Sequence, residues 1–186
     1  GLADHGWSYI NIDDGWQGRR GGRYNAIQPN KKFPDMAALT REIHDMGLRV
    51  GIYSTPWIGT YAAHIGSYSD RPDGENEWIE KGLHNENYRY QKPGGNYWED
   101  RCEVWHHGPY SFVEADVKQW AEWGIDYLKY DWHPLNYYHV REMFDMLRKI
   151  DRDIIFSLSN SAPYGDAPVW QRYACLLYTS PSPRDV

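Results

Sequence analysis

Cysteine, long apolar runs and an excess of basic charge are all lacking in this sequence. Its 186 residues include only two cysteines, Cys102 and Cys175, which excludes a multi-bridge framework, and no zinc-type CxxC or His/Cys spacing occurs. The mean hydropathy is −0.81, and no run of 18 apolar residues is present, so we expect no membrane partner. Twenty basic residues stand against 26 acidic ones, for a net charge of −6. A nucleic-acid binder would show a basic stripe instead.

Two further signals are missing. The chain begins Gly1-Leu2-Ala3 rather than with methionine, so the lack of a signal peptide says nothing about the compartment. The glycine-rich GxGxxG turn of dinucleotide-binding sheets is also absent. A doubly wound nucleotide fold is therefore disfavoured.

Aromatic residues, by contrast, are abundant. Ten Trp, 16 Tyr and four Phe make up 16% of the chain. Trp and Tyr offer flat apolar faces with a polar edge, which suits a site that stacks against sugar rings. A tryptophan-rich core explains the same composition equally well, and we expect Trp120 and Trp123 to belong to a core helix face.

Apolar periodicity alternates between strand and helix along the chain. Strands are expected at 7–13, 48–53, 125–130 and 153–158, and helices at 36–46, 112–123, 140–150 and 167–174. This order is typical of parallel βα units. Each predicted strand ends in polar or aromatic residues, as in (βα)8 barrels, whose active sites lie at that end. Because a barrel needs about 250 residues, we expect an α/β fold that is a partial (βα)8 barrel of about four strands.

Two stretches interrupt this pattern. Residues 54–110 show no sustained period and are expected to be a functional loop insertion rather than disorder, since they carry several tryptophans and histidines. From residue 175 the sequence reads CLLYTSPSPRDV, whose two prolines cannot continue a helix. We therefore expect a catalytic barrel domain over 1–174 and a non-native or disordered tail over 175–186, resembling adapter read-through.

The most informative short motif is Lys129-Tyr130-Asp131. The strand period of two places Lys129 and Asp131 on one face and Tyr130 on the other. A lysine beside an aspartate favours the carboxylate and is expected to depress its pKa. An ionised, oriented carboxylate suits a glycosidase nucleophile or a metal ligand. A structural ion pair at a strand end explains the motif equally well.

A second acidic unit, Asp13-Asp14, ends the first strand. Adjacent carboxylates can accept hydrogen bonds from a polyol, bind Ca²⁺ or Mg²⁺, or cap a turn. The histidines His106, His107 and His133 lack the spacing of a helical metal site, so we expect them to be ordinary loop residues. No metal site is predicted.

Five short segments of the sequence resemble those of a known family. The segments are YINIDDGWQ, KFPDM, GLRVGIYS, AEWGIDYLKYDW and FSLSNSAP. In their order and approximate spacing, over residues 1 to about 174, they resemble the alpha-galactosidase (melibiase) family, glycoside hydrolase family 27. The resemblance implies a retaining mechanism on a (βα)8 barrel without a cofactor. Asp131 matches the nucleophile, and Asp13 and Asp14 match the pair that holds the galactose 4- and 6-hydroxyls. Tyr53 and Lys129 match further sugar contacts.

The sequence departs from the family pattern in three places. The family's acid/base is an aspartate after a Trp-Arg pair, some fifty to sixty residues beyond the nucleophile. Asp185 lies near that distance in a foreign context, so we expect no acid/base in this chain. Trp132-His133 stands where some members carry a cysteine. Ser159 and Ala162 occupy the region near the sugar 2-position, and their small size would leave room for an N-acetyl group.

The resemblance thus predicts a retaining hydrolase of terminal alpha-D-galactosyl residues whose partner is a galactose-containing carbohydrate. The 186-residue chain by itself is expected to be inactive. Alternatives within the family are an alpha-N-acetylgalactosaminidase and, less favoured because Asp14 is not a glutamate, a beta-L-arabinopyranosidase. A noncatalytic carbohydrate-binding protein is the alternative from another class. A secreted or periplasmic location is implied by the family alone.

Overall fold

The computed structural model describes residues 1–75, 105–159, 164–174 and 176–177. Its elements are η1 (Leu2–His5), β1 (Tyr9–Ile12), β2 (Gln17–Gly21), β3 (Ala26–Pro29), α1 (Met36–Asp45), β4 (Arg49–Ser54), β5 (Tyr68–Ser69), β6 (Tyr110–Ser111), α4 (Val113–Trp123), β7 (Tyr127–Tyr130), α5 (Tyr137–Leu147), β8 (Ile155–Leu158), η3 (Tyr164–Asp166), α6 (Ala167–Trp170) and β9 (Leu176–Leu177). No helix in these ranges is long and apolar enough to cross a bilayer.

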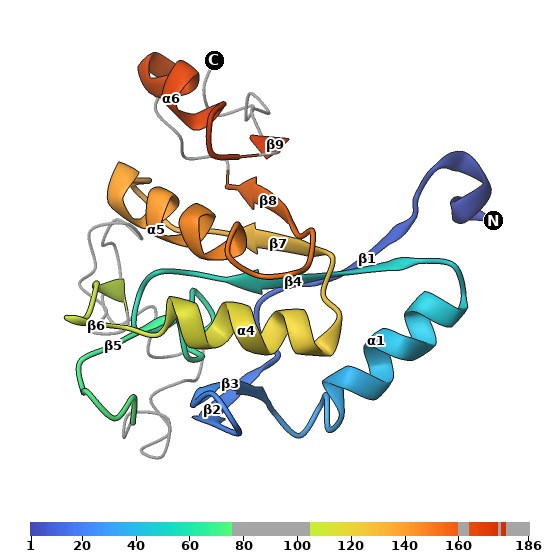
Figure 1. Cartoon of the computed structure of the whole chain (residues 1–186), viewed down its shortest axis with the longest axis horizontal. Coiled ribbons are helices and arrows are strands. Elements are labelled where there is room, and N and C mark those ends of the chain that lie inside the picture. The colour runs from blue at the N-terminus through green and yellow to red at the C-terminus, as the bar shows by residue number, and fades with distance from the viewer. Residues whose placement is uncertain (76–104, 160–163, 175, 178–186) are drawn as a thin grey trace, which may run out of the picture.

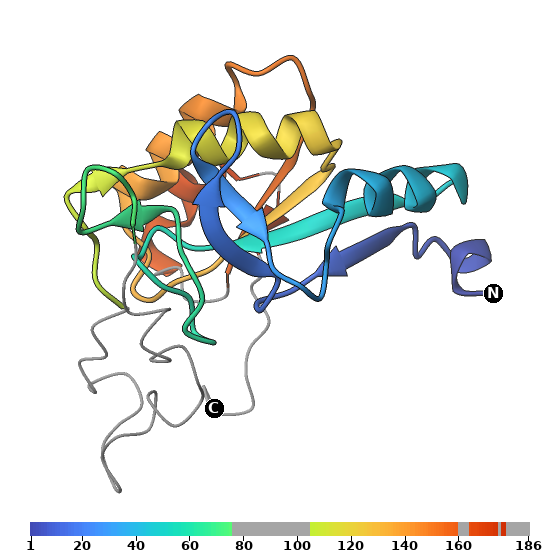
Figure 2. The same cartoon turned by 90° about the horizontal axis from the view of Figure 1, so that it is seen from below.

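The main sheet has the order β1-β4-β7-β8-β9, and all its pairings are parallel (Figure 1). Helices α1, α4 and α5 lie on one face of it (Figure 2). The expected partial (βα)8 barrel is confirmed. Parallel strands need crossover connections, and the helices between the strands supply them.

Helix boundaries follow from local capping. The Asp35 side chain accepts a hydrogen bond from the Ala38 N–H at 2.8 Å to begin α1. Asn136 does the same for α5, accepting from the His139 N–H at 3.1 Å. Helix α4 ends at Gly124, whose φ of +87° only glycine adopts without strain. These ends lie within three residues of those that the sequence predicted.

The core lies between the sheet and the helices. Val50, Ile52, Leu128 and Phe156 project from alternate strand positions and are almost fully buried. Trp120, on the inner face of α4, is completely buried, and Trp123 packs against the same core. The prediction that both tryptophans are core residues is confirmed.

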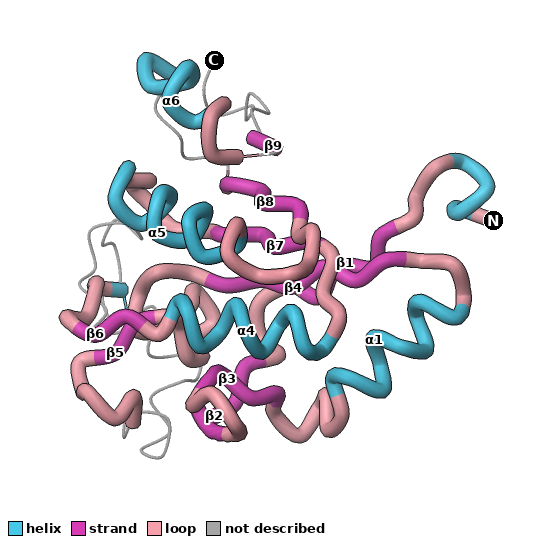
Figure 3. The backbone as a smooth tube through the Cα atoms, in the orientation of Figure 1, coloured by secondary structure: helices cyan, strands magenta, loops and turns pink. Residues whose placement is uncertain are grey.

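Two small antiparallel pairs lie outside the main sheet (Figure 3). The segment that follows β1 forms the hairpin β2–β3. A Cβ at Gly18 would come within 3.0 Å of two carbonyl oxygens on the opposite strand, so this glycine permits the close pairing. Strands β5 and β6 pair within the predicted insertion.

Two residues of the tail belong to the main sheet. Leu176 and Leu177 form β9 and pair in parallel with Ser157 and Leu158. The non-native or disordered tail over 175–186 stays a prediction. Residues 175 and 178–186, including Cys175 and Asp185, lie outside the described residues, as do Cys102 and Ala162.

Candidate active site

The predicted site residues meet at the carboxyl ends of β1, β4 and β7. Lys129 Nζ lies 2.9 and 3.1 Å from the two carboxylate oxygens of Asp13 and 3.8 Å from an Asp131 oxygen. The same ammonium lies 5.2 Å from the centre of the Tyr53 ring. Tyr53 and Lys129 are paired across β4 and β7, so their side chains project to the same face. Asp13, Tyr53, Lys129 and Asp131 therefore lie together at one end of the sheet.

Asp14 faces a different partner from Asp13. Its Oδ2 accepts a hydrogen bond from the Ala62 backbone N–H at 2.7 Å, while its own N–H donates to Asp13 Oδ1 at 2.8 Å. Gly15, with a φ of +108°, turns the chain directly after the two carboxylates. Asp13 is thus held by a charge on β7, and Asp14 by the backbone of the loop that follows β4.

The pKa of Asp131 departs from the sequence prediction. Burial raises it, and the negative charge of Asp13 acts in the same direction. A hydrogen bond with the Ser159 side chain and the charge of Lys129 lower it, but the net pKa stays above the ordinary value. Lys129 lowers the pKa as predicted, but the expectation of a net lowered pKa is wrong, because burial outweighs the lysine. The lysine is half-exposed, so water screens its charge, whereas the carboxylate itself is mostly removed from water.

Tyr53 supplies a buried hydroxyl at the same place. Its side chain is 1% exposed, and among the described residues its hydroxyl has no hydrogen-bond partner. The indole N–H of Trp16 donates to the Tyr53 carbonyl at 2.9 Å and fixes this part of β4. Burial raises the pKa of the phenol, and the charges of Asp14 and Asp131 raise it further. The phenol therefore stays protonated and can donate a hydrogen bond to a ligand.

Other candidates named from the sequence lie nearby or elsewhere. Ser159, expected near the sugar 2-position, contacts the Asp131 carboxylate. His106 pairs with Asp70 at 2.8 Å, and His107 stacks on His139 with ring centres 4.0 Å apart. In the described part of the chain, no three His, Cys, Asp or Glu residues are grouped to hold a metal ion.

The sequence did not predict the contact between Asp14 and the loop that follows β4. Residues 59–65 form a closed turn in which Gly59 bridges Ile65. The only local signals were the glycines on either side, Gly59 and Gly66, because neither strand nor helix periodicity marks such a turn. Its contact with Asp14 joins residues 48 positions apart and is not readable from either segment alone.

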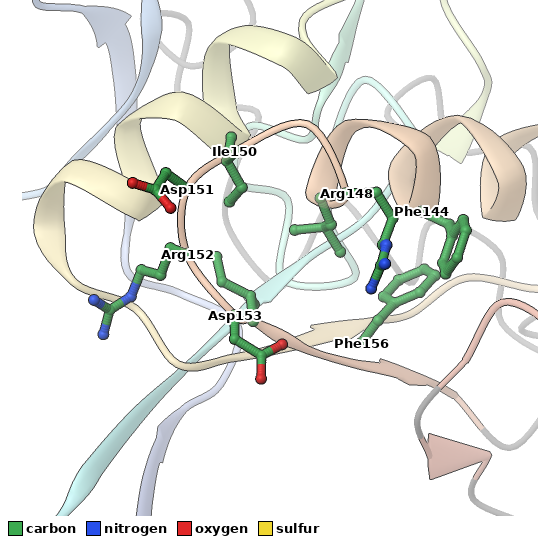
Figure 4. A pocket seen from close by; sticks show the side chains of 9 residues that line it. Phe144, Arg148, Ile150, Asp151, Arg152, Asp153 and Phe156 are labelled. Carbon is green, nitrogen blue, oxygen red and sulfur yellow. The ribbon is translucent and has the colours of Figure 1, made fainter.

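A pocket of about 360 Å³ lies at the other end of the sheet (Figure 4). Its lining includes Phe144 and Leu147 of α5, Phe156 of β8, and Arg148 and Ile154 between them. These residues surround the end of α5 and the start of β8, whereas the carboxylates follow the ends of β1 and β7. This pocket is therefore separate from the candidate active site.

Comparison with known proteins shows which proteins this chain is similar to. The protein-family model described as Alpha galactosidase A matches residues 1–80. Alpha-galactosidase A of Cellvibrio japonicus is 31% identical over 179 residues, covering 92% of this chain and 32% of the relative. The Neosartorya fischeri protein named Probable alpha-galactosidase B is 34% identical over 135 residues, covering 70% of this chain and 21% of the relative.

The fold is also similar to that of a solved structure. The crystal structure of alpha-galactosidase I from Mortierella vinacea superposes with a TM-score of 0.64 at 24% identity, covering 98% of this chain and 41% of that one. This likeness supports the fold alone. The chain spans between a fifth and a third of the length of the two relatives named above, so its sheet corresponds to only part of such a protein.

Proposed function

Since this chain belongs to the alpha-galactosidase family, we propose that the whole protein is a retaining glycoside hydrolase that removes terminal alpha-D-galactosyl residues from a carbohydrate. The observation that carries this proposal is the cluster of Asp13, Tyr53, Lys129 and Asp131 at the carboxyl ends of parallel strands. Such a cluster offers hydrogen-bond acceptors, a positive charge and a protonated phenol for sugar hydroxyls beside the mostly buried carboxylate of Asp131. Residues 1–174 would form part of the catalytic domain.

In this proposal, Asp131 is the nucleophile. Its carboxylate oxygen would attack the anomeric carbon, and the bond from that carbon to the leaving oxygen would break, forming a glycosyl-enzyme. A general acid protonates the leaving oxygen and then, as a base, activates the water that hydrolyses the intermediate. We assign no residue of this chain to that second role. Residues near Asp185 do not have the sequence context that the family resemblance requires.

The remaining residues would hold the sugar. Asp13 and Asp14 would accept hydrogen bonds from the 4- and 6-hydroxyls, and Tyr53 would donate one from its buried phenol. Lys129 would lie against the same ring, since it already bridges Asp13 and Asp131. The chemistry of this donor set needs no cofactor. Export from the cytoplasm is proposed on family resemblance alone.

A mechanism-based inactivator tests this proposal. A fluorinated alpha-galactoside with a good leaving group, incubated with the whole protein, should form a stable covalent adduct on the peptide that contains Asp131. Mass spectrometry of the digest would locate it. The Asp131→Asn variant should remain unlabelled, and its turnover should fall by about 10⁴-fold or more.

The inactivator experiment and substrate kinetics together separate the alternatives. A noncatalytic carbohydrate-binding protein would bind galactose but trap no adduct. A preference for N-acetylgalactosaminides or beta-L-arabinopyranosides over galactosides, measured as kcat/KM, would replace the substrate assignment and keep the nucleophile. An adduct on a carboxylate other than Asp131 would contradict the site assignment itself.

A further inference from the structure

The loop after β4 contains a small closed turn with its own hydrogen bonds. The Thr60 N–H donates to the His64 carbonyl at 2.7 Å, and the Ala63 N–H donates to the Thr60 carbonyl at 2.9 Å. The Thr60 hydroxyl accepts from the His64 N–H at 3.1 Å. Ala63 is fully buried with a φ of +58°. This backbone conformation costs free energy in a non-glycine residue, so the surrounding contacts must hold it in place.

An aromatic cluster supplies those contacts. The Tyr61 ring lies edge-on to Trp57, 5.1 Å between ring centres, and edge-on to Trp105, 5.6 Å between centres. Trp57 and Trp105 stack on each other at 5.9 Å, and the Trp105 indole N–H donates to the Thr60 carbonyl at 3.3 Å. Gly66 closes the loop so tightly that a Cβ there would lie 2.0 Å from the Trp57 carbonyl oxygen. Tyr61 is thus packed edge-on against both stacked indoles.

This turn lies against the sugar-binding carboxylates. Ala62, the residue after Tyr61, donates its N–H to Asp14 Oδ2 at 2.7 Å. The His64 imidazole lies next to Gly15, within 3.8 Å of where a Cβ would stand. The Asp13 carboxylate is instead paired with Lys129. The turn therefore contacts the Asp14 carboxylate directly.

We propose that the turn at residues 60–64 is a positioning element for Asp14, and that Tyr61, packed against Trp57 and Trp105, holds the Ala62 N–H against the Asp14 carboxylate. One oxygen of Asp14 is thereby fixed, and the orientation of the other toward a sugar hydroxyl follows from it. A backbone donor is suited to this task because it has no rotamers to lose on binding. The inference rests on the proposed function, in which Asp14 contacts the sugar.

A double-mutant cycle on the whole protein tests it. Tyr61→Ala is combined with Asp14→Ala and, as the matched control pair, with Asp13→Ala, since an asparagine would keep an oxygen that accepts from the Ala62 N–H. KM and kcat are measured with 4-nitrophenyl alpha-D-galactopyranoside, and the dissociation constant of free galactose is measured alongside, so that weakly active variants still report. Tyr61→Phe keeps the ring against the two indoles, and Tyr110→Ala removes an exposed tyrosine outside the turn.

The expected result is coupling to Asp14 alone. Tyr61→Ala should weaken kcat/KM on the order of 10-fold in the parent and in Asp13→Ala, and by less than about 2-fold in the Asp14→Ala background. Tyr61→Phe should restore most of the loss, and Tyr110→Ala should change nothing. Equal losses in both aspartate backgrounds would show a merely structural role and overturn the inference. A parent that binds and hydrolyses galactosides while Tyr61→Ala has no effect would overturn it without touching the proposed function. A parent that neither binds nor hydrolyses would overturn both.

Discussion

Lys129 lies between two carboxylates, and its two distances give it two different tasks. It contacts both oxygens of Asp13 at 2.9–3.1 Å but only approaches Asp131, at 3.8 Å. Charge-assisted hydrogen bonds are strong at the shorter distance, so the lysine chiefly fixes Asp13. Its influence on Asp131 acts through space and opposes the effect of burial on the pKa.

Removing this charge should therefore move the acidic limb of the pH profile. The proposed nucleophile must be ionised, so activity falls as the pH drops through the pKa of Asp131. In Lys129→Gln, the lowering influence on that pKa is lost and the repulsion from Asp13 is uncovered. The acidic limb of log kcat/KM should shift to higher pH in the whole protein. Lys118→Gln, which removes an exposed lysine on α4, should leave the limb in place, and a shift to lower pH in Lys129→Gln would contradict the argument.

At the scale of elements, the hairpin β2–β3 is attached to the barrel by one buried ion pair. Arg20 bonds Asp116 of α4 at 2.7 Å, and their side chains are 2% and 0% exposed. Asp116 also accepts from the Ile27 N–H at 2.9 Å, and Arg20 donates to the Gly66 carbonyl at 2.6 Å. The pair therefore joins the hairpin, α4 and the loop after β4.

Breaking this pair should destabilise the fold strongly. Asp116→Ala leaves the Arg20 charge buried without its partner, which costs about 3–5 kcal/mol in comparable cases. Urea unfolding of the whole protein, followed by the barrel's tryptophan fluorescence, would measure the loss. Glu114→Ala on the same helix breaks an exposed pair with Lys118 and should cost no more than about 1 kcal/mol. Similar losses in the two variants would contradict this interpretation of the buried pair.

Asp126 joins elements at the opposite end of the sheet from the carboxylate cluster. It bonds His44 of α1 at 2.7 Å, Arg152 at 2.6 Å and the Val50 N–H of β4 at 2.9 Å. Burial raises the pKa of Asp126, but the Val50 and His44 hydrogen bonds and the charge of Arg152 outweigh it, so the net pKa is lowered. A lowered folded-state pKa stabilises the fold above the unfolded-state value and loses that contribution as the pH falls.

The barrel should therefore lose stability in acid partly through this residue. The window begins near the ordinary aspartate pKa of about 3.9 and extends downward to the lowered folded-state value. Asp126→Asn should be less stable than the parent at pH 7 and should lose less stability as the pH falls below about 4. Urea unfolding at a series of pH values measures both effects. Parallel pH curves for parent and variant would show that Asp126 does not carry this acid sensitivity.

At the scale of the whole molecule, helices cover one face of the main sheet, and β1 lies at the edge of that sheet (Figure 2). Near that edge, Trp7 and Ile10 are 71% and 42% exposed. An edge strand with exposed apolar neighbours invites pairing between chains. The Asp13 side chain is itself 65% exposed, whereas sugar sites are usually enclosed.

The 186-residue chain by itself should consequently show no appreciable galactosidase activity, although the whole protein is proposed to be active. Positioned proton transfer typically contributes about 10²–10⁴-fold, and a poorly enclosed sugar site would cost further rate through misplacement. An aryl galactoside with a good leaving group needs little acid assistance and is the fairest substrate. Turnover by the purified chain that Asp131→Asn abolishes would contradict this expectation.

The local sequence was enough to determine the alternation of strands and helices, the cap Asp35, and the placement of Lys129 and Asp131 on one face. These features depend on side-chain period and on contacts within a few residues, so neighbouring positions in the sequence contain them. The convergence of strand ends followed as well, because parallel strands share one carboxyl edge.

Only the tertiary structure decided the rest. The bond between Asp14 and Ala62, the hairpin tied by Arg20 to Asp116, and the pairing of Leu176 and Leu177 with β8 join residues that are about 20 to 96 positions apart. The pKa of Asp131 went the opposite way from the prediction for the same reason. A neighbouring lysine can be read from the sequence, but desolvation depends on what the whole fold packs around a carboxylate, and here desolvation is the larger effect.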